Sequence, residues 1–86
     1  MPLYFSAHTT ACLTKQALRE LIQEIMAATE VKVRRAVASQ IGGRMLVEAE
    51  ASDQEKLEHF YAARRIVAEW IMRIDIDAHE GHVVEC

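Results

Sequence analysis

The stretch IDIDAHEGHVVEC, residues 74–86, is the densest run of metal-ligating and titratable side chains in the sequence. It holds two aspartates, two glutamates, two histidines and a cysteine in thirteen residues. Imidazole and carboxylate groups are ligands that suit zinc or nickel, and Gly81 permits a turn between His79 and His82. This spacing is common by chance, and most such tails are solvated. We therefore predict that residues 78–86 form a polar C-terminal tail with weak affinity for zinc or nickel at His79 and His82.

A second group of chemically capable side chains lies on an alternating segment near the N-terminus. Residues 3–10, LYFSAHTT, alternate as a half-buried strand does, and we expect Leu3, Phe5 and Ala7 to face the core. A histidine on the other face could act as a general acid or base near neutral pH, and an arginine could hold a carboxylate bidentately. The candidate residues on that face are His8, Tyr4 and Arg73 for catalysis and Ser6, Glu48 and Asp75 for ligand binding.

A simpler interpretation exists for the same residues. His8 can hydrogen-bond a neighbour on a polar surface without taking part in any reaction. Arg73 can form an ion pair with Asp75 or Glu48 across the sheet, as opposite charges on neighbouring strands often do. The sequence alone leaves both interpretations open.

The elements that must position these residues follow from hydrophobic spacing and capping signals. In residues 13–29, LTKQALRELIQEIMAAT, large apolar residues recur at three- and four-residue steps, which is typical of an amphipathic helix. Thr14 is the expected N-cap, and Leu13 before it can pack on Leu18. The capping box SDQE, residues 52–55, predicts a second helix that begins at Asp53.

Residues 31–51 predict a hairpin, because Gly42 and Gly43 supply the positive φ that a tight turn requires. A two-residue Gly-Gly loop would turn Ala36 and Ala38 toward the core. A three-residue loop, Ile41–Gly43, would turn Val37 toward the core instead. The second register separates apolar from charged side chains better, and burial determines register. We therefore predict the three-residue loop.

Residues 69–77, EWIMRIDID, alternate again and predict the last strand. The order strand, helix, strand, strand, helix, strand predicts an α+β fold of the ferredoxin-like βαββαβ type. This is a four-stranded antiparallel sheet with two helices on one face. Residues 1–86 are expected to form a single domain. The expected core consists of Phe5, Leu18, Leu21, Ile25, Val37, Val47, Leu57, Phe60, Met72 and Ile74.

Composition excludes several classes of function. The net charge is −3, and the sequence has neither a basic stripe nor the aromatic-rich pattern of RNA-recognition domains, so we expect no nucleic acid partner. No apolar run is long enough to span a bilayer and no signal peptide is recognisable, so we expect no membrane partner and a cytoplasmic location. Two cysteines are too few for a disulfide framework and are expected to be reduced.

A four-stranded sheet that helices cover on one side only, in a chain of 86 residues, favours association between copies. We expect a homo-oligomer, at least a dimer. In this the chain resembles the dimeric α+β barrel proteins, in which two ferredoxin-like subunits pack sheet against sheet. The passage GRMLVEAEASDQEKLEHFY, residues 43–61, also resembles a family of small ferredoxin-like bacterial proteins, some of them linked to nickel. Membership of that family would imply a metal-binding or small-ligand role.

We therefore expect a small cytoplasmic domain that binds a ligand and oligomerises, with weak metal binding at most. The alternative is a small cofactor-free isomerase or oxygenase of the dimeric barrel kind, with His8, Tyr4 and Arg73 around its cleft. An enzyme of this kind needs an enclosed cavity into which His8 points. A His8 without such a cavity favours the binding domain.

Overall fold

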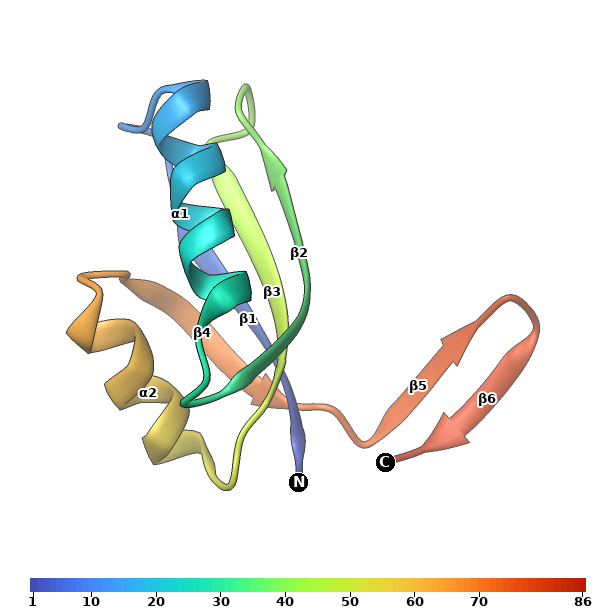
Figure 1. The fold of residues 1–86 in the computed structure, drawn as a ribbon. Helices are drawn as coiled ribbons and strands as arrows, with labels where there is room; N and C mark the ends of the chain where they lie inside the picture. Colours follow the sequence, from blue (N-terminus) through green and yellow to red (C-terminus); the bar gives the residue numbers. More distant parts are fainter.

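Two helices lie on one face of a four-stranded antiparallel sheet with the strand order β2-β3-β1-β4 (Figure 1). The structure is a computed structural model that describes residues 1–86. It confirms the α+β class and the position of both helices in the chain order. The elements are β1 (Leu3–Thr9), α1 (Lys15–Ala27), β2 (Lys32–Ser39), β3 (Arg44–Glu50), α2 (Gln54–Ala63), β4 (Ala68–Arg73), β5 (Ile76–His79) and β6 (His82–Glu85).

Helix α1 begins after the predicted N-cap, Thr14, whereas α2 begins at Gln54, one residue later than predicted, because Asp53 and not Ser52 is its N-cap. The Thr14 hydroxyl accepts a hydrogen bond from the backbone N–H of Ala17 at 3.1 Å. The Asp53 carboxylate accepts one from the N–H of Lys56 at 2.8 Å. Each cap satisfies a backbone donor that the first turn of a helix leaves free. Local sequence therefore determines where each helix starts.

The main core lies between the helices and the sheet. Leu21 packs against this core but is only partly buried. Val37 and Met72, which were expected in the core, lie on the opposite face of the sheet and are 41% and 52% exposed. Five of the expected core residues are buried as predicted: Leu18, Ile25, Val47, Leu57 and Phe60.

The side of β1 that faces the helices is the opposite of that predicted, although Leu3 and Ala7 are buried as expected. Ser6 and His8 are buried beneath the helices, and Tyr4 belongs to the main core. Phe5 is half-buried on the other side of the sheet, where its ring lies 6.0 Å from that of Trp70. The prediction fails because Ser6 and His8 are polar residues that find hydrogen-bond partners inside the core, which removes the cost of burying them.

The β2–β3 hairpin has a longer turn than predicted. Ser39 pairs with Arg44, so the connecting loop has four residues, 40–43, and the predicted three-residue loop is wrong. Ala36 consequently faces the core and Val37 faces away, as the rejected register proposed. A bulge between Val33 and Arg35 shifts the alternation, which lets Val33 face the core as well.

The C-terminal residues form a hairpin and not a polar tail. The predicted last strand ends at Arg73, four residues early, and β5 and β6 pair in a separate two-stranded sheet. Glu80 and Gly81 form its turn with φ values of 50° and 80°, the signs that a type I′ turn requires. This C-terminal hairpin, residues 76–85, projects away from the body (Figure 1). None of the helices is long and apolar enough to cross a membrane.

Candidate functional site

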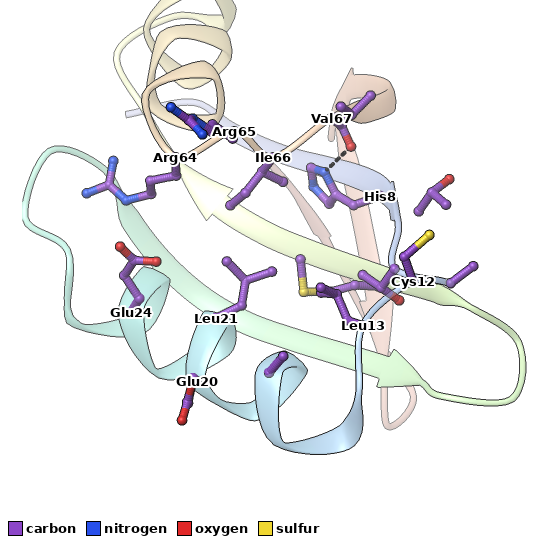
Figure 2. Close-up of a pocket in the computed structure, with 15 residues that line it drawn as sticks. His8, Cys12, Leu13, Glu20, Leu21, Glu24, Arg64, Arg65, Ile66 and Val67 are labelled. Atoms are coloured by element: carbon purple, nitrogen blue, oxygen red, sulfur yellow. Dashed lines mark hydrogen bonds between the residues drawn. The ribbon is translucent and has the colours of Figure 1, made fainter.

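A cleft opens where the two helices diverge. Helix α1 packs toward β2 and helix α2 packs toward β4, so neither covers the end of the central strand β1. The resulting cavity has a volume of about 630 Å³ and lies between α1 and the α2–β4 loop (Figure 2). Eight of its fifteen lining residues are hydrophobic, with Leu13, Leu21, Met45 and Ile66 among them. His8 lies at its inner end.

His8 belongs to a buried hydrogen-bonded chain that links three elements of the fold. Its Nδ1 lies 3.1 Å from the Val67 carbonyl oxygen, and its Nε2 lies 2.8 Å from the Ser6 hydroxyl. The Ser6 hydroxyl lies 2.7 Å from the Tyr61 hydroxyl. The Tyr61 ring meets the His8 ring edge to face at 4.4 Å. The chain therefore joins β1, helix α2 and the loop before β4.

The donors along this chain follow from what each group can do. The Val67 carbonyl can only accept, so Nδ1 of His8 carries the proton. In the neutral imidazole Nε2 is then an acceptor, and Ser6 donates to it. The Ser6 oxygen in turn accepts from the Tyr61 hydroxyl. Both ring nitrogens of His8 are therefore occupied, which leaves neither free to take a proton from a bound molecule.

Burial keeps this chain neutral. Desolvation lowers the pKa of His8 below its usual value, and the Val67 carbonyl and the Glu69 carboxylate oppose that effect only in part. Burial also raises the pKa of Tyr61, although the hydrogen bond with Ser6 works in the opposite direction. A neutral histidine and a protonated tyrosine are the states that the bonding pattern needs.

Two further groups at the cleft are left with unused hydrogen-bonding capacity. The hydroxyl of Thr10 is buried and has no hydrogen-bond partner in the protein, although its backbone N–H donates to Gly43. The Nε of Arg64 is also buried and unpaired. The remainder of that guanidinium is well held, at 2.7 Å from Glu30 and stacked over the Phe60 ring. Such groups are uncommon inside proteins.

Arg65 stands at the rim of the cleft in an unusual backbone conformation. Helix α2 ends with the N–H of Arg65 bonded to the Ala62 carbonyl and that of Ile66 bonded to the Tyr61 carbonyl, the pattern of a Schellman motif. The left-handed position of that motif is usually glycine, but here it is Arg65, with φ 58°. The structure shows no ion pair for its guanidinium.

The other residues proposed from the sequence are not gathered in this cleft. Only Ser6 and His8 are brought together. Glu48 lies on the opposite face of the sheet, 3.8 Å from Arg34. Arg73 and Asp75 form an exposed ion pair at 3.8 Å, as the simpler interpretation proposed. Tyr4 is buried in the main core and supplies no group to the cleft.

His79 and His82 lie directly opposite each other across the C-terminal hairpin. Residues paired in this way place their side chains on the same face of the strands. Asp77 shares that face, with its carboxylate 3.8 Å from Nδ1 of His79. The structure contains no group of three or more histidine, cysteine, aspartate or glutamate side chains arranged to hold a metal ion.

Sequence reasoning missed Tyr61, Thr10 and Arg65 as members of the site. A signal existed for Tyr61, because a tyrosine on the buried side of a helix needs a partner for its hydroxyl. No protein-family model matches this chain, and no curated protein or solved structure matches it. The function of the cleft is therefore inferred from its own geometry.

Proposed function

We propose that this chain is a ferredoxin-like small-molecule-binding domain, and that its cleft binds a monocarboxylate with a hydrocarbon tail. The observation that carries the proposal is a cavity of about 630 Å³, with hydrophobic side chains over just more than half of its lining and Arg65, which forms no ion pair, at its rim. The strand order β2-β3-β1-β4 and the two helices on one face support the ferredoxin-like assignment of the body.

The cavity suits a ligand that is mostly apolar. Pockets for small organic molecules usually measure about 300–1,000 Å³ and combine apolar walls with a few polar groups. Leu21 of α1 and Ile66 of the opposite loop face each other across this cleft (Figure 2). A hydrocarbon chain between them would be removed from water on both sides, which is worth about 0.8 kcal/mol per methylene group.

Arg65 is the group suited to the carboxylate. The neighbouring Arg64 is already neutralised by Glu30, whose pKa the hydrogen bond from Arg64 holds below its usual value. Arg65 retains its full donor capacity, and a guanidinium matches a carboxylate with two parallel hydrogen bonds. A non-glycine residue in the left-handed region costs about 1–2 kcal/mol, and such strain is concentrated at functional sites.

The opposite wall limits the charge of the ligand. Glu20 and Glu24 of α1 line the same cleft, and the Glu24 carboxylate points toward the Arg64 side of it (Figure 2). Their carboxylates would repel a second negative charge, so a monocarboxylate fits better than a dicarboxylate. The bonded ring nitrogens of His8 favour binding over catalysis, because neither nitrogen is free to act as a base.

The test is calorimetric titration with straight-chain carboxylates of increasing length. Affinity should rise roughly fourfold for each added methylene until the cavity is full. Arg65→Gly should weaken binding roughly tenfold or more, because a hydrogen bond to a charged group is lost. The same substitution should stabilise the free protein by about 0.5–1 kcal/mol, because relief of the strain at φ 58°, about 1–2 kcal/mol, exceeds the entropic cost of glycine. Loss of binding in that variant would not result from unfolding.

Arg44→Gln is the matched control, because Arg44 is an exposed arginine on β3 that does not line the cleft. It should bind each carboxylate as the wild type does. Alkylamines of the same chain lengths are the control ligands. Tighter binding of the amines than of the carboxylates would mean that Glu20 and Glu24 select the ligand, and the proposal would be wrong.

A further inference from the structure

The turn between α2 and β4 that carries Arg65, residues 65–67, is held only weakly by packing. Arg65 is exposed and Val67 is 73% exposed, so neither side chain anchors the turn in the core. Ile66 packs against the core but is only partly buried. The backbone of Arg65 is strained at φ 58° and would relax if the turn were free to move. Contacts other than packing must therefore hold this turn.

The backbone before Arg65 is held by the end of helix α2. The Tyr61 carbonyl accepts hydrogen bonds from the N–H groups of Arg64 and Ile66, which flank Arg65, both at 3.0 Å. The Tyr61 hydroxyl in turn lies 2.7 Å from the Ser6 hydroxyl of β1. Tyr61 therefore connects the start of the turn to the sheet.

The backbone after Arg65 is held by His8. Its Nδ1 donates to the Val67 carbonyl at 3.1 Å, the hydrogen bond drawn in Figure 2. The register of the β1–β4 pairing shifts just before His8, so the regular ladder is interrupted where the turn joins β4. The His8 ring is itself fixed, because its Nε2 is bonded to Ser6 and the Tyr61 ring meets it edge to face at 4.4 Å.

We infer that His8 is a positioning residue of the cleft. Through the Val67 carbonyl it holds the turn 65–67, and with it the Arg65 guanidinium, at the rim where the carboxylate would bind. This inference rests on the proposed function and adds to it the group that prepares the site. Without this hydrogen bond the turn would have to be ordered each time a ligand binds, and the cost of that ordering lowers affinity.

Two amide substitutions of His8 separate its two hydrogen bonds. The side-chain nitrogen of asparagine is as many bonds from the backbone as Nδ1, so His8→Asn can still donate to Val67. The nitrogen of glutamine is one bond farther out and matches Nε2, so His8→Gln can reach Ser6 but not Val67. Val33→Ala is the control for a general loss of stability. Val33 is buried, lies on the edge strand β2 and does not line the cleft.

The first measurement is limited tryptic digestion of the ligand-free protein, with the first cut located by mass spectrometry. Trypsin cleaves after arginine, and a folded loop is cleaved only when it opens. His8→Gln should be cleaved after Arg64 or Arg65 roughly tenfold faster than the wild type, and His8→Asn at nearly the wild-type rate. Val33→Ala should show no preference for these two positions. Far-UV circular dichroism verifies that each variant is folded.

The second measurement is calorimetric titration with a straight-chain carboxylate and with the alcohol of the same length. In the wild type the carboxylate should bind roughly tenfold more tightly, because it alone can form a charged pair with Arg65. His8→Gln should lose most of this preference but keep the gain in affinity for each added methylene, since the apolar walls are unchanged. His8→Asn and Val33→Ala should keep both.

Nitrogen NMR of the wild type gives a result that needs no variant. In the neutral ring of His8 the proton should be on Nδ1, the atom that donates to Val67, and Nε2 should be unprotonated. A proton on Nε2 would overturn the inference, because the carbonyl would then have no donor.

Three results with the variants would also overturn the inference. The first is cleavage of His8→Gln after Arg64 or Arg65 no faster than that of Val33→Ala. The second is an unchanged carboxylate preference in His8→Gln. The third is equal loss of that preference in His8→Asn and His8→Gln, because the bond to Val67 would then not be the cause. A wild type that binds neither carboxylate nor alcohol would instead refute the proposed function, and digestion and NMR would still decide whether His8 holds the turn.

Discussion

Replacing Ser6 with alanine should be far more costly than the loss of one hydroxyl suggests. Ser6 is fully buried, and its hydroxyl satisfies both His8 and Tyr61. In Ser6→Ala, Nε2 of His8 and the Tyr61 hydroxyl both lose their partner in the interior. Each buried polar group left unpaired costs about 1–3 kcal/mol, so we expect a loss of roughly 2–6 kcal/mol. That is a large part of the stability of a typical domain.

The same reasoning predicts a strong coupling between Ser6 and Tyr61. Tyr61→Phe removes a hydroxyl while Ser6 still donates to His8, so it should cost only about 0.5–1.5 kcal/mol. In the double variant, Ser6→Ala with Tyr61→Phe, the unpaired tyrosine hydroxyl no longer exists. The double variant should therefore be no less stable than Ser6→Ala alone. The effects of the two substitutions should not add.

The assay is urea unfolding of the four proteins at one protein concentration, because association would otherwise change the apparent stability. Thr9→Ala is the control for losing a hydroxyl bond on the surface, since Thr9 donates to Glu69 at 2.6 Å in an exposed position. It should cost no more than about 0.5 kcal/mol. Additive losses in the double variant, or a Ser6→Ala loss no larger than that of Thr9→Ala, would refute the hydrogen-bonded chain as described.

Three further predictions concern pH, metal binding and the β2–β3 turn. Burial lowers the pKa of His8 in the folded chain, so stability should fall as the pH drops from about 6.5 toward that lower pKa, by at most about 1.4 kcal/mol per pH unit. Urea unfolding across this range should show the loss in wild type and His59→Asn, an exposed control, but not in His8→Asn. Calorimetry should give zinc or nickel binding no tighter than about micromolar and weaker below about pH 6. If the His79→Ala/His82→Ala variant gives the same binding heat as the wild type, the site is disproved. Gly43→Ala should lower the thermal midpoint, because φ is 66° and the new Cβ would lie 3.1 Å from a carbon of the loop after β1.

Local signals in the sequence were sufficient to predict both helices. Thr14 and Asp53 cap their own helices through backbone groups only three residues away, so no distant contact is needed. Leu18 and Ile25 lie on the buried stripe that their seven-residue spacing indicates. The β2–β3 hairpin likewise depends on residues close together in sequence, so its presence was predicted correctly, although its loop length was not.

The faces of β1 could not be predicted from the strand itself. Its two alternating sets have different polarity, and the more apolar set was expected in the core. Ser6 faces the core because of Tyr61, a partner 55 residues away in sequence. The cleft forms because the two helices diverge, and the sequence of one helix does not determine where the other lies. The bulge in β2 likewise shifts its alternation, so periodicity alone predicts the wrong face for Val37.

The central position of β1 has a consequence for how the chain acquires its fold during synthesis. β1 is made first, yet it forms hydrogen bonds with β3 on one side and β4 on the other. Its second edge therefore stays open until the ribosome has released the chain as far as Arg73. The β2–β3 hairpin and both helices can form earlier, because their contacts are local. Closing the sheet must wait for the pairing of β1 with β4, which joins residues far apart in sequence, and such non-local contacts slow folding.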